Sequence, residues 1–304
     1  MSQTILILGA SGFIGRHLAQ NFAAAGCDVI AATRHDVSFE HPHIRNVVSD
    51  FVQHEEFLPL LHECDMVFHA ASCSTPGSSA AQPQLDGNLR TTLALIEGLQ
   101  ENPNPRVVFI SSGGTLYGET PAPVNERATL RPRSYHAAGK IAAEYFLKAW
   151  AAQYSGDVTL LRPSNVYGPG QLPKPGFGII PTAFAKALNG TPLHILGDGS
   201  AVRDYIYIDD FSALCRSIIA SEKQPGCRVF NVSSGVGLSL NALLDAIDSI
   251  SGRPLVRQYE SKRLIDIQKI LLDSSAARSA YDWQPRISIE YGLAVTWAWQ
   301  RQIA

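Results

Sequence analysis

The chain has 304 residues, of which 45% are hydrophobic and 17% charged, and its formal net charge is −2. This balance is typical of a globular protein of one or two domains with a sizeable core, and it excludes a disordered chain. A net charge near zero supplies no field that would recruit a polyanion, so we expect neither nucleic acid nor a membrane as partner.

Cysteine usage and the apolar runs bear on the compartment. Five cysteines are scattered without the spacing of metal ligands, and we expect reduced thiols and no metal site. The apolar run at residues 5–8 is too short for a targeting segment, and no stretch approaches the roughly 18 apolar residues of a membrane span. We therefore expect a cytoplasmic protein. The cysteines are Cys27, Cys64, Cys73, Cys215 and Cys227.

The first half of the chain alternates short apolar runs with longer amphipathic segments. Several runs lack strict alternation of polar and apolar residues, which is typical of strands covered on both faces. This order predicts an α/β fold with a doubly wound parallel sheet of the Rossmann type. We expect strands at residues 4–10, 28–34, 44–50, 65–71, 106–112 and 158–166, and helices at residues 13–25, 83–100 and 137–153.

The pattern changes after residue 165. Residues 167–176 are rich in glycine and proline and predict a loop, after which the expected elements are shorter. We expect a dinucleotide-binding Rossmann domain over residues 1–165 and a smaller, mixed α/β substrate-binding lobe over residues 166–304. A helix at 210–221 and a strand at 228–232 look regular enough for about residues 206–232 to rejoin the first sheet.

The first expected strand ends in a glycine-rich turn that opens into a helix. Gly9 permits a tight turn, Gly12 lets the backbone approach a pyrophosphate, and Gly15 lets the helix pack against the strand. Free amides at the helix start would then receive the negative charge. The spacing predicts dinucleotide binding rather than a merely structural βα turn, and the other cofactor-binding residues of this loop are Ser11, Phe13 and Ile14.

The second strand's end bears on the choice between NAD and NADP. An acidic residue there would accept a ribose hydroxyl, whereas arginine favours the 2′-phosphate of NADP. This chain has Thr33 and Arg34, which favours NADP, although Arg34 could instead be a solvated residue at a strand end. Asp50 and Phe51, after the third strand, are expected beside the adenine.

Past the glycine loop, short motifs follow one another in a specific order and spacing. They are Val-Phe-His-Ala-Ala at 67–71, Ser-Ser-Gly-Gly-Thr-Leu-Tyr-Gly at 111–118, Leu-Arg-Pro-Ser-Asn-Val-Tyr-Gly-Pro at 161–169, Gly-Asp-Gly-Ser at 197–200 with Arg-Asp-Tyr at 203–205, Arg-Leu-Ile-Asp at 263–266, and Trp-Gln-Pro at 283–285. Together they resemble the extended short-chain dehydrogenase/reductase family, in particular its NDP-sugar epimerases, dehydratases and reductases, over nearly the whole chain.

The resemblance implies a cofactor site and a sugar-nucleotide site. Besides the loop, it assigns to the cofactor Ala70, Ala71, Asn88, Ser111, Lys140, Pro163 and Ser164. It assigns to the substrate Gly113, Asn165, Arg203, Arg263 and Asp266.

Arg203 and Arg263 have a physical interpretation of their own. The planar fork of a guanidinium suits phosphate oxygens, so two of them could clamp the diphosphate of a sugar nucleotide. Surface ion pairing with Asp204 and Asp266 is the alternative, and the resemblance favours the clamp.

The resemblance also implies a Tyr and a Lys four residues apart on one helix, where the Lys charge depresses the pKa of the phenol. Lys140 fits that pattern, but Tyr135 precedes it by five residues, and His136 occupies the usual position. Five positions place two side chains about 140° apart around a helix. In addition, Gly113 stands where a Ser or Thr is usual, and Ser112 precedes it.

Three interpretations remain open. Tyr135 reaches the site through an irregular first helical turn, or His136 serves as the acid–base with its ordinary pKa of about 6.5, or the site is inactive. We favour Tyr135 with Lys140, and Ser112 as the partner of the reacting oxygen.

We expect an NDP-sugar 4-epimerase that acts on a UDP-hexose by transient oxidation with NAD(P). Dehydratases of the family carry an Asp-Glu pair in the turn that Gly114 and Thr115 occupy here, which disfavours dehydration. The alternatives are an NADP-dependent 4-keto-6-deoxy-sugar nucleotide reductase and a non-catalytic binder of nucleotide sugar or NAD(P). The resemblance further implies a homodimer formed through the helices at 83–100 and 137–153.

Overall fold

A computed structural model describes residues 2–72, 74, 80–120, 122–174, 176–263 and 265–303. The chain forms two compact units, each assembled from several stretches. The first comprises Met1–Ser112, Tyr135–Arg162 and Cys215–Phe230, and the second Gly113–Ser134, Pro163–Leu214 and Asn231–Ala304.

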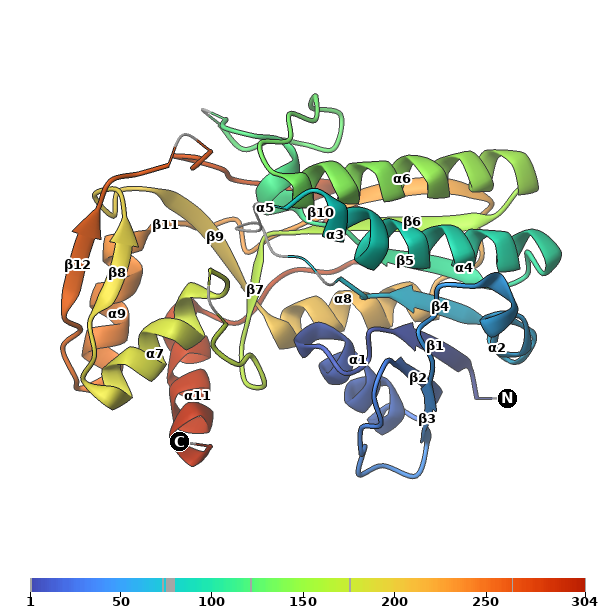
Figure 1. Ribbon diagram of the computed structural model, residues 1–304, viewed down its shortest axis with the longest axis horizontal. Helices are drawn as coiled ribbons and strands as arrows, with labels where there is room; N and C mark the ends of the chain where they lie inside the picture. The colour runs from blue at the N-terminus through green and yellow to red at the C-terminus, as the bar shows by residue number, and fades with distance from the viewer. Residues whose placement is uncertain are drawn as a thin grey trace. The chain divides into compact units, whose positions relative to one another are not determined.

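A seven-stranded sheet forms the centre of the first unit, in the order β10-β6-β5-β4-β1-β2-β3 (Figure 1). The pairings that run from β3 through to β6 are parallel. All five residues of β5 are buried, as expected of a strand covered on both faces. The strands are β1 (Thr4–Leu8), β2 (Asp28–Thr33), β3 (Ile44–Val48), β4 (Met66–His69), β5 (Arg106–Ile110), β6 (Asp157–Pro163) and β10 (Gly226–Val232).

Helices cover both faces of this sheet. Figure 1 shows α4 (Arg90–Glu101) and α6 (Tyr135–Tyr154) along one face and α1 (Phe13–Ala24) and α8 (Ile208–Ala220) along the other. Arg216 of α8 donates a hydrogen bond to Asn21 of α1, which ties these two helices together. The doubly wound α/β fold predicted from the sequence is confirmed. Shorter helices are η1 (His54–Glu56), α2 (Leu58–Glu63), α3 (Gln82–Gln84) and the π-helical turn η2 (Leu85–Leu89).

The expected elements differ from the observed ones mainly at their ends. The first strand stops at Leu8 rather than at residue 10, because Gly9 adopts a φ of +80° and turns the chain. The helix expected at 137–153 begins two residues earlier, at Tyr135. The helix expected at 83–100 is α3, the π turn and α4 in succession.

The second unit has two small sheets and a group of helices. β9 lies between β11 and β7, while β12 pairs with β8 in parallel. Helices α7, α9 and α11 pack on one another. The elements are α5 (Gly113–Leu116), β7 (Asn165–Tyr167), α7 (Ile179–Asn189), β8 (Leu193–Leu196), β9 (Val202–Tyr207), β11 (Gly237–Ser239), α9 (Leu240–Ser251), β12 (Arg257–Glu260), α10 (Ser275–Tyr281) and α11 (Ile289–Gln302).

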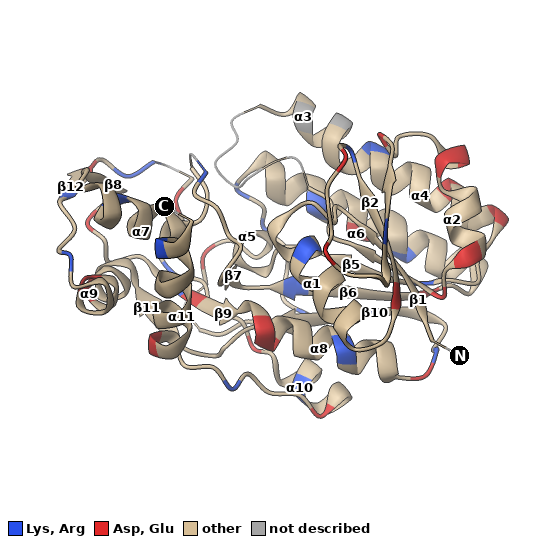
Figure 2. Cartoon of the chain, turned by 90° about the horizontal axis from the view of Figure 1, so that it is seen from below, with Lys and Arg blue, Asp and Glu red and all other residues tan. Residues whose placement is uncertain are grey.

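Charges of both signs are interspersed over the elements of the first unit (Figure 2), in keeping with the small net charge. Within the described part of the chain, no helix combines the length and apolar character that a membrane crossing requires. Nor do the described residues contain a group of three or more side chains able to hold a metal ion. Of the cysteines, Cys27, Cys64, Cys215 and Cys227 are free thiols, and Cys73 lies outside the described residues.

Candidate cofactor site and catalytic helix

The turn between β1 and α1 has no room for side chains at two of its glycines. A Cβ on Gly9 would lie 2.7 Å from both Cα and N of Ala71, in the segment after β4. A Cβ on Gly15 would lie 2.2 Å from the carbonyl oxygen of Gly9. Because these neighbours are backbone atoms, the glycines let strand, helix and the Ala70–Ala71 segment approach one another closely.

The N-terminus of α1 is left open for an anion. Gly12 is its N-cap and provides no side-chain hydrogen bond, and the first turn contains no acidic residue. Ser11 is exposed, and Phe13 and Ile14 are half-buried. Backbone amides at a helix start, with the positive end of the dipole, suit a pyrophosphate. The cradle therefore fits a dinucleotide.

The residues directly after β2 include an exposed arginine. Thr33 is buried, and its hydroxyl lies 2.7 Å from the carbonyl of His35 and 2.8 Å from Oδ1 of Asn46, so it holds its own loop. Arg34 is exposed. Asp50 is also exposed, whereas Phe51 is buried with a φ of +55° and packs on Phe57.

Helix α6 places His136 and Lys140 together in the interior. His136 is 6% exposed and Lys140 is 4% exposed, and the step of four positions from one to the other amounts to about one helical turn. Tyr135, the first residue of the helix, is 51% exposed. Burial and the nearby ammonium of Lys140 lower the pKa of His136 to about 4, so its imidazole is neutral at neutral pH.

Lys140 is held at the end of β5. Its Nζ donates a 2.9 Å hydrogen bond to the carbonyl of Ile110 and lies 4.7 Å from the centre of the Phe109 ring. Ser111, the next residue, is buried, and its hydroxyl has no hydrogen-bond partner among the described residues. Such an unpaired buried hydroxyl is costly unless a ligand completes it. Ser112 is half-buried.

A polar cluster that the sequence did not indicate surrounds His136. Nδ1 of His136 lies 3.0 Å from Oγ of Ser74, which donates a 2.6 Å hydrogen bond to Oε1 of Gln84. Asn88 donates to Ser74 at 2.7 Å and to Gln84 at 3.0 Å. Of these, only Asn88 was predicted at the site. The interruption of the helical pattern by Pro83 and Gly87 was the one local signal of the π turn that carries Asn88.

In the second unit, two predicted residues are held by Asp204 of β9. Ser164 donates to its carboxylate, and Nδ2 of Asn165 donates to its backbone carbonyl at 2.9 Å. Pro163, at the end of β6, is buried. Gly113 is buried at the start of α5, which begins three residues after the end of β5.

The two arginines have different surroundings. Arg203 donates to the backbone carbonyls of Val202, at 2.8 Å, and of Ile267. Arg263 is exposed and forms a 2.7 Å ion pair with Asp266. Thus Arg263 makes the ion pair considered from the sequence, while the described contacts of Arg203 are with carbonyls rather than with Asp204.

Comparison with known proteins places these features in a family. Residues 5–233 match the NAD dependent epimerase/dehydratase family. A UDP-glucose 4-epimerase of Mycolicibacterium smegmatis is 33% identical over 303 residues, with 96% of each chain covered.

Two solved structures extend the likeness to the whole fold. The UDP-glucose 4-epimerase of Thermotoga maritima, solved with UDP-glucose, is 29% identical with a TM-score of 0.90, and the match covers 99% of each chain. The Thermus thermophilus UDP-glucose 4-epimerase, solved with NAD, is 27% identical with a TM-score of 0.90, covering 99% of this chain and all of that one.

Proposed function

Because the chain belongs to the NAD dependent epimerase/dehydratase family, we propose that it is an NDP-sugar 4-epimerase acting on a UDP-hexose. It is an enzyme of the extended short-chain dehydrogenase/reductase group. The sugar hydroxyl at C4 is oxidised transiently and then reduced from the other side, so that the cofactor is regenerated within one turnover.

The observation that carries this proposal is the composition of α5. The four residues Gly113–Leu116 follow β5 and offer the hydroxyl of Thr115 but no carboxylate. Elimination of water would need an acid and a base at this turn, as in the family's dehydratases. Epimerisation needs only the hydride carrier, which is the cofactor, and one acid–base group. This chain supplies the acid–base group on α6.

Several residues of the first unit would hold the cofactor. The amides at the start of α1 bind its pyrophosphate, and the ammonium of Lys140 anchors the nicotinamide ribose. A bound nicotinamide would supply the acceptor, and then the donor, of the hydride at the sugar carbon. The chain's own contribution is to hold the sugar hydroxyl beside a proton acceptor while this happens.

The test is incubation of the purified protein with UDP-glucose, followed by proton NMR. We expect UDP-galactose to accumulate to equilibrium without net consumption of added cofactor. Stoichiometric loss of NADPH with a 4-keto-6-deoxy sugar nucleotide would make the protein a reductase. Bound ligand without any turnover on a panel of UDP-hexoses would make it a binder.

For the cofactor, NAD is the family's group, and preference for NADP is the finer proposal. The exposed guanidinium of Arg34 favours it, since no acidic residue directly follows Thr33. Arg34→Ala should then weaken NADP more than NAD, by the roughly 1.5–3 kcal/mol of a charged hydrogen bond. Tighter binding of NAD than of NADP by the parent protein would refute the preference.

For the substrate, we propose that Arg203 and Arg263 clamp the diphosphate. Arg263, which is exposed, would exchange its half-buried Asp266 partner for a phosphate. Each change to alanine should raise the dissociation constant of UDP about 10- to 150-fold and leave NAD affinity unchanged. Parental UDP affinity in both variants, measured by calorimetry, would favour a purely structural role.

A homodimer through α4 and α6 is a further part of the proposal. Tyr145 and Phe146 of α6 are 59% and 45% exposed, which is unusual for neighbouring aromatic residues on a monomer surface. Tyr145→Glu with Phe146→Glu should convert a dimer to a monomer in sedimentation. The cytoplasmic location stays a prediction that cell fractionation tests.

A further inference from the structure

His136 lies in the interior, one helical turn from Lys140, rather than on the solvent-exposed side of α6. Both side chains lie in the interior, His136 precedes Lys140 by four residues, and Tyr135 lies outside this pair on a half-exposed side. A residue at this place on the helix and a lysine one turn later can act on the same bound ligand. Tyr135, about 140° from Lys140 around the helix, is not placed for that.

The hydrogen bonds of Ser74 determine which nitrogen of His136 carries the proton. The Ser74 hydroxyl has a single proton, and its shortest contact is the 2.6 Å one to Oε1 of Gln84, which can only accept. The same Oε1 also accepts from Asn88. Oγ of Ser74 therefore accepts from His136, so Nδ1 is protonated and Nε2 carries the lone pair.

We infer that His136, through Nε2, is the catalytic acid–base of this enzyme, in the place where its family uses a tyrosine, and that Ser74, Gln84 and Asn88 are positioning residues for it. This inference rests on the proposed epimerase function. Nε2 takes the proton of the sugar hydroxyl as the O–H bond breaks, and a bound, oxidised nicotinamide would supply the acceptor for the hydride that leaves with the electron pair of the C–H bond. Return of the hydride to the opposite face and of the proton from Nε2 to oxygen gives the epimer and restores the neutral imidazole.

Burial and the ammonium of Lys140 lower the pKa of this histidine below that of a solvated one. The charge of the ammonium, added to burial, disfavours a second charge on the imidazole, so the pKa is lowered to about 4. The imidazole is thus unprotonated throughout the neutral range, as a base must be, and the imidazolium formed in the reaction returns its proton readily. The described side chains hydrogen-bonded to the His136 ring or to its partner do not titrate in this range. They are Ser74, Gln84 and Asn88.

The first test compares four variants by kcat with UDP-glucose. His136→Phe should lower kcat about 10²–10⁴-fold, the usual contribution of general acid–base catalysis. Tyr135→Phe should lose far less, and Tyr154→Phe, at the exposed end of the same helix, should keep the parent's activity. His136→Tyr restores a phenol four residues before Lys140 and should recover much of the rate. A larger loss in Tyr135→Phe than in His136→Phe overturns the inference.

The pH profile distinguishes catalysis from a structural role. The base must be deprotonated, so the parent's rate should fall only as pH drops through about 4. In His136→Tyr the acidic limb should move several units higher, because a phenol is then the base. An acidic limb that does not move between the two proteins overturns the inference.

A second test requires no turnover. In protein labelled with ¹⁵N-histidine, the signals lost in His136→Phe belong to His136, and at pH 7 they should report the neutral tautomer protonated at Nδ1. A neutral tautomer protonated at Nε2 overturns the inference. Absence of turnover in the parent would instead refute the proposed function and leave the tautomer to decide whether Nε2 is available as a base.

Discussion

At the scale of single residues, the site depends on backbone approaches that only glycine allows. Gly9, which follows β1, has a φ of +80°, and Gly26, which follows the C-cap of α1, has a φ of +90°. They differ in their surroundings: a Cβ on Gly9 would collide with the backbone of Ala71, while a Cβ on Gly26 would meet nothing within 4 Å. A comparison of Gly9 with Gly26 therefore separates the effect of a positive φ from the effect of a steric clash at Cβ.

Gly9→Ala should lower the free energy of unfolding by about 2–5 kcal/mol, since left-handed strain of about 1–2 kcal/mol adds to overpacking of about 1–3 kcal/mol. Gly26→Ala should incur the strain alone. Urea unfolding of both variants measures the difference, and NAD binding should suffer only in Gly9→Ala. Equal destabilisation of the two would show that the contact with Ala71 relaxes freely.

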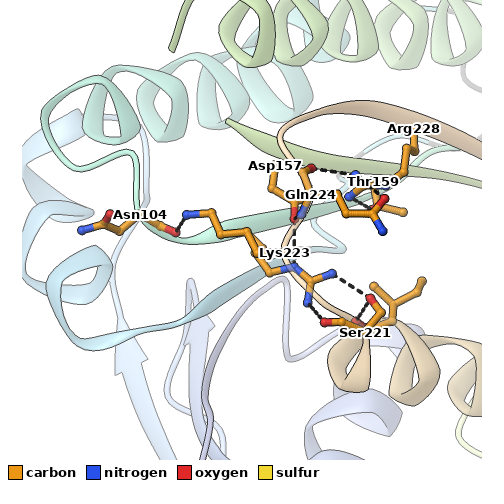
Figure 3. Close-up of polar contacts among 9 residues, drawn as sticks. Asn104, Asp157, Thr159, Ser221, Lys223, Gln224 and Arg228 are labelled. Carbon is orange, nitrogen blue, oxygen red and sulfur yellow. Dashed lines mark hydrogen bonds and ion pairs between the residues drawn. The ribbon is translucent and has the colours of Figure 1, made fainter. Parts of the chain in front are cut away.

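At the scale of elements, a buried ion cluster ties together the amino ends of three strands (Figure 3). Asp157, the first residue of β6, is 1% exposed and accepts from Nε of Arg106, on β5, at 3.1 Å and from Arg228, on β10. It also accepts from the backbone amide of Gln224 at 2.7 Å, in the segment that leads into β10. Arg106 in turn donates to the carbonyl of Ser221, at the end of α8, at 2.8 Å.

Asp157→Ala should destabilise the first unit by about 3–5 kcal/mol, because it leaves the buried guanidinium of Arg106 and the half-buried one of Arg228 without this counter-charge. The control is Asp245→Ala. Asp245 forms a 2.8 Å ion pair with Arg257, and the Asp245 side chain is 69% exposed. That pair should be worth at most about 1 kcal/mol. Chemical unfolding compares the two. A similar small loss in both would mean that water reaches the Asp157 cluster.

The sequence predicted the elements better than the contacts between them. Apolar runs located each main strand to within two or three residues, because burial of both sheet faces leaves a continuous signal. The π turn at Leu85–Leu89 and the roles of Ser74 and Gln84 escaped prediction. Hydrogen bonds such as that between Ser74 and His136, 62 positions apart, leave no periodic trace. The atypical spacing of Tyr135 and Lys140 was visible, but burial was needed to relate Lys140 to His136.

At the scale of the whole molecule, each unit buries weak acids whose neutral form is favoured in the folded state. In the first unit, burial raises the pKa of the Cys64 thiol to about 12 from its ordinary 9.0. In the second, burial raises the pKa of Tyr205 to about 12 from 10.0. Desolvation is the largest cause in both cases. Both units should therefore lose stability at alkaline pH for the same physical reason.

Such a raised pKa contributes stability that is complete below the unfolded value and is lost as pH rises towards the folded value. For Tyr205 the window is therefore pH 10–12, and at pH 11 the loss is about 1.4 kcal/mol. Cys64 begins to destabilise the fold earlier, from about pH 9. Unfolding free energies measured at pH 8 and pH 11 should differ less in Tyr205→Phe than in the parent. Tyr291→Phe, at a position 60% exposed, should keep the parent's pH dependence. If Tyr205→Phe also keeps it, the Tyr205 phenol ionises in the folded state as readily as in the unfolded one.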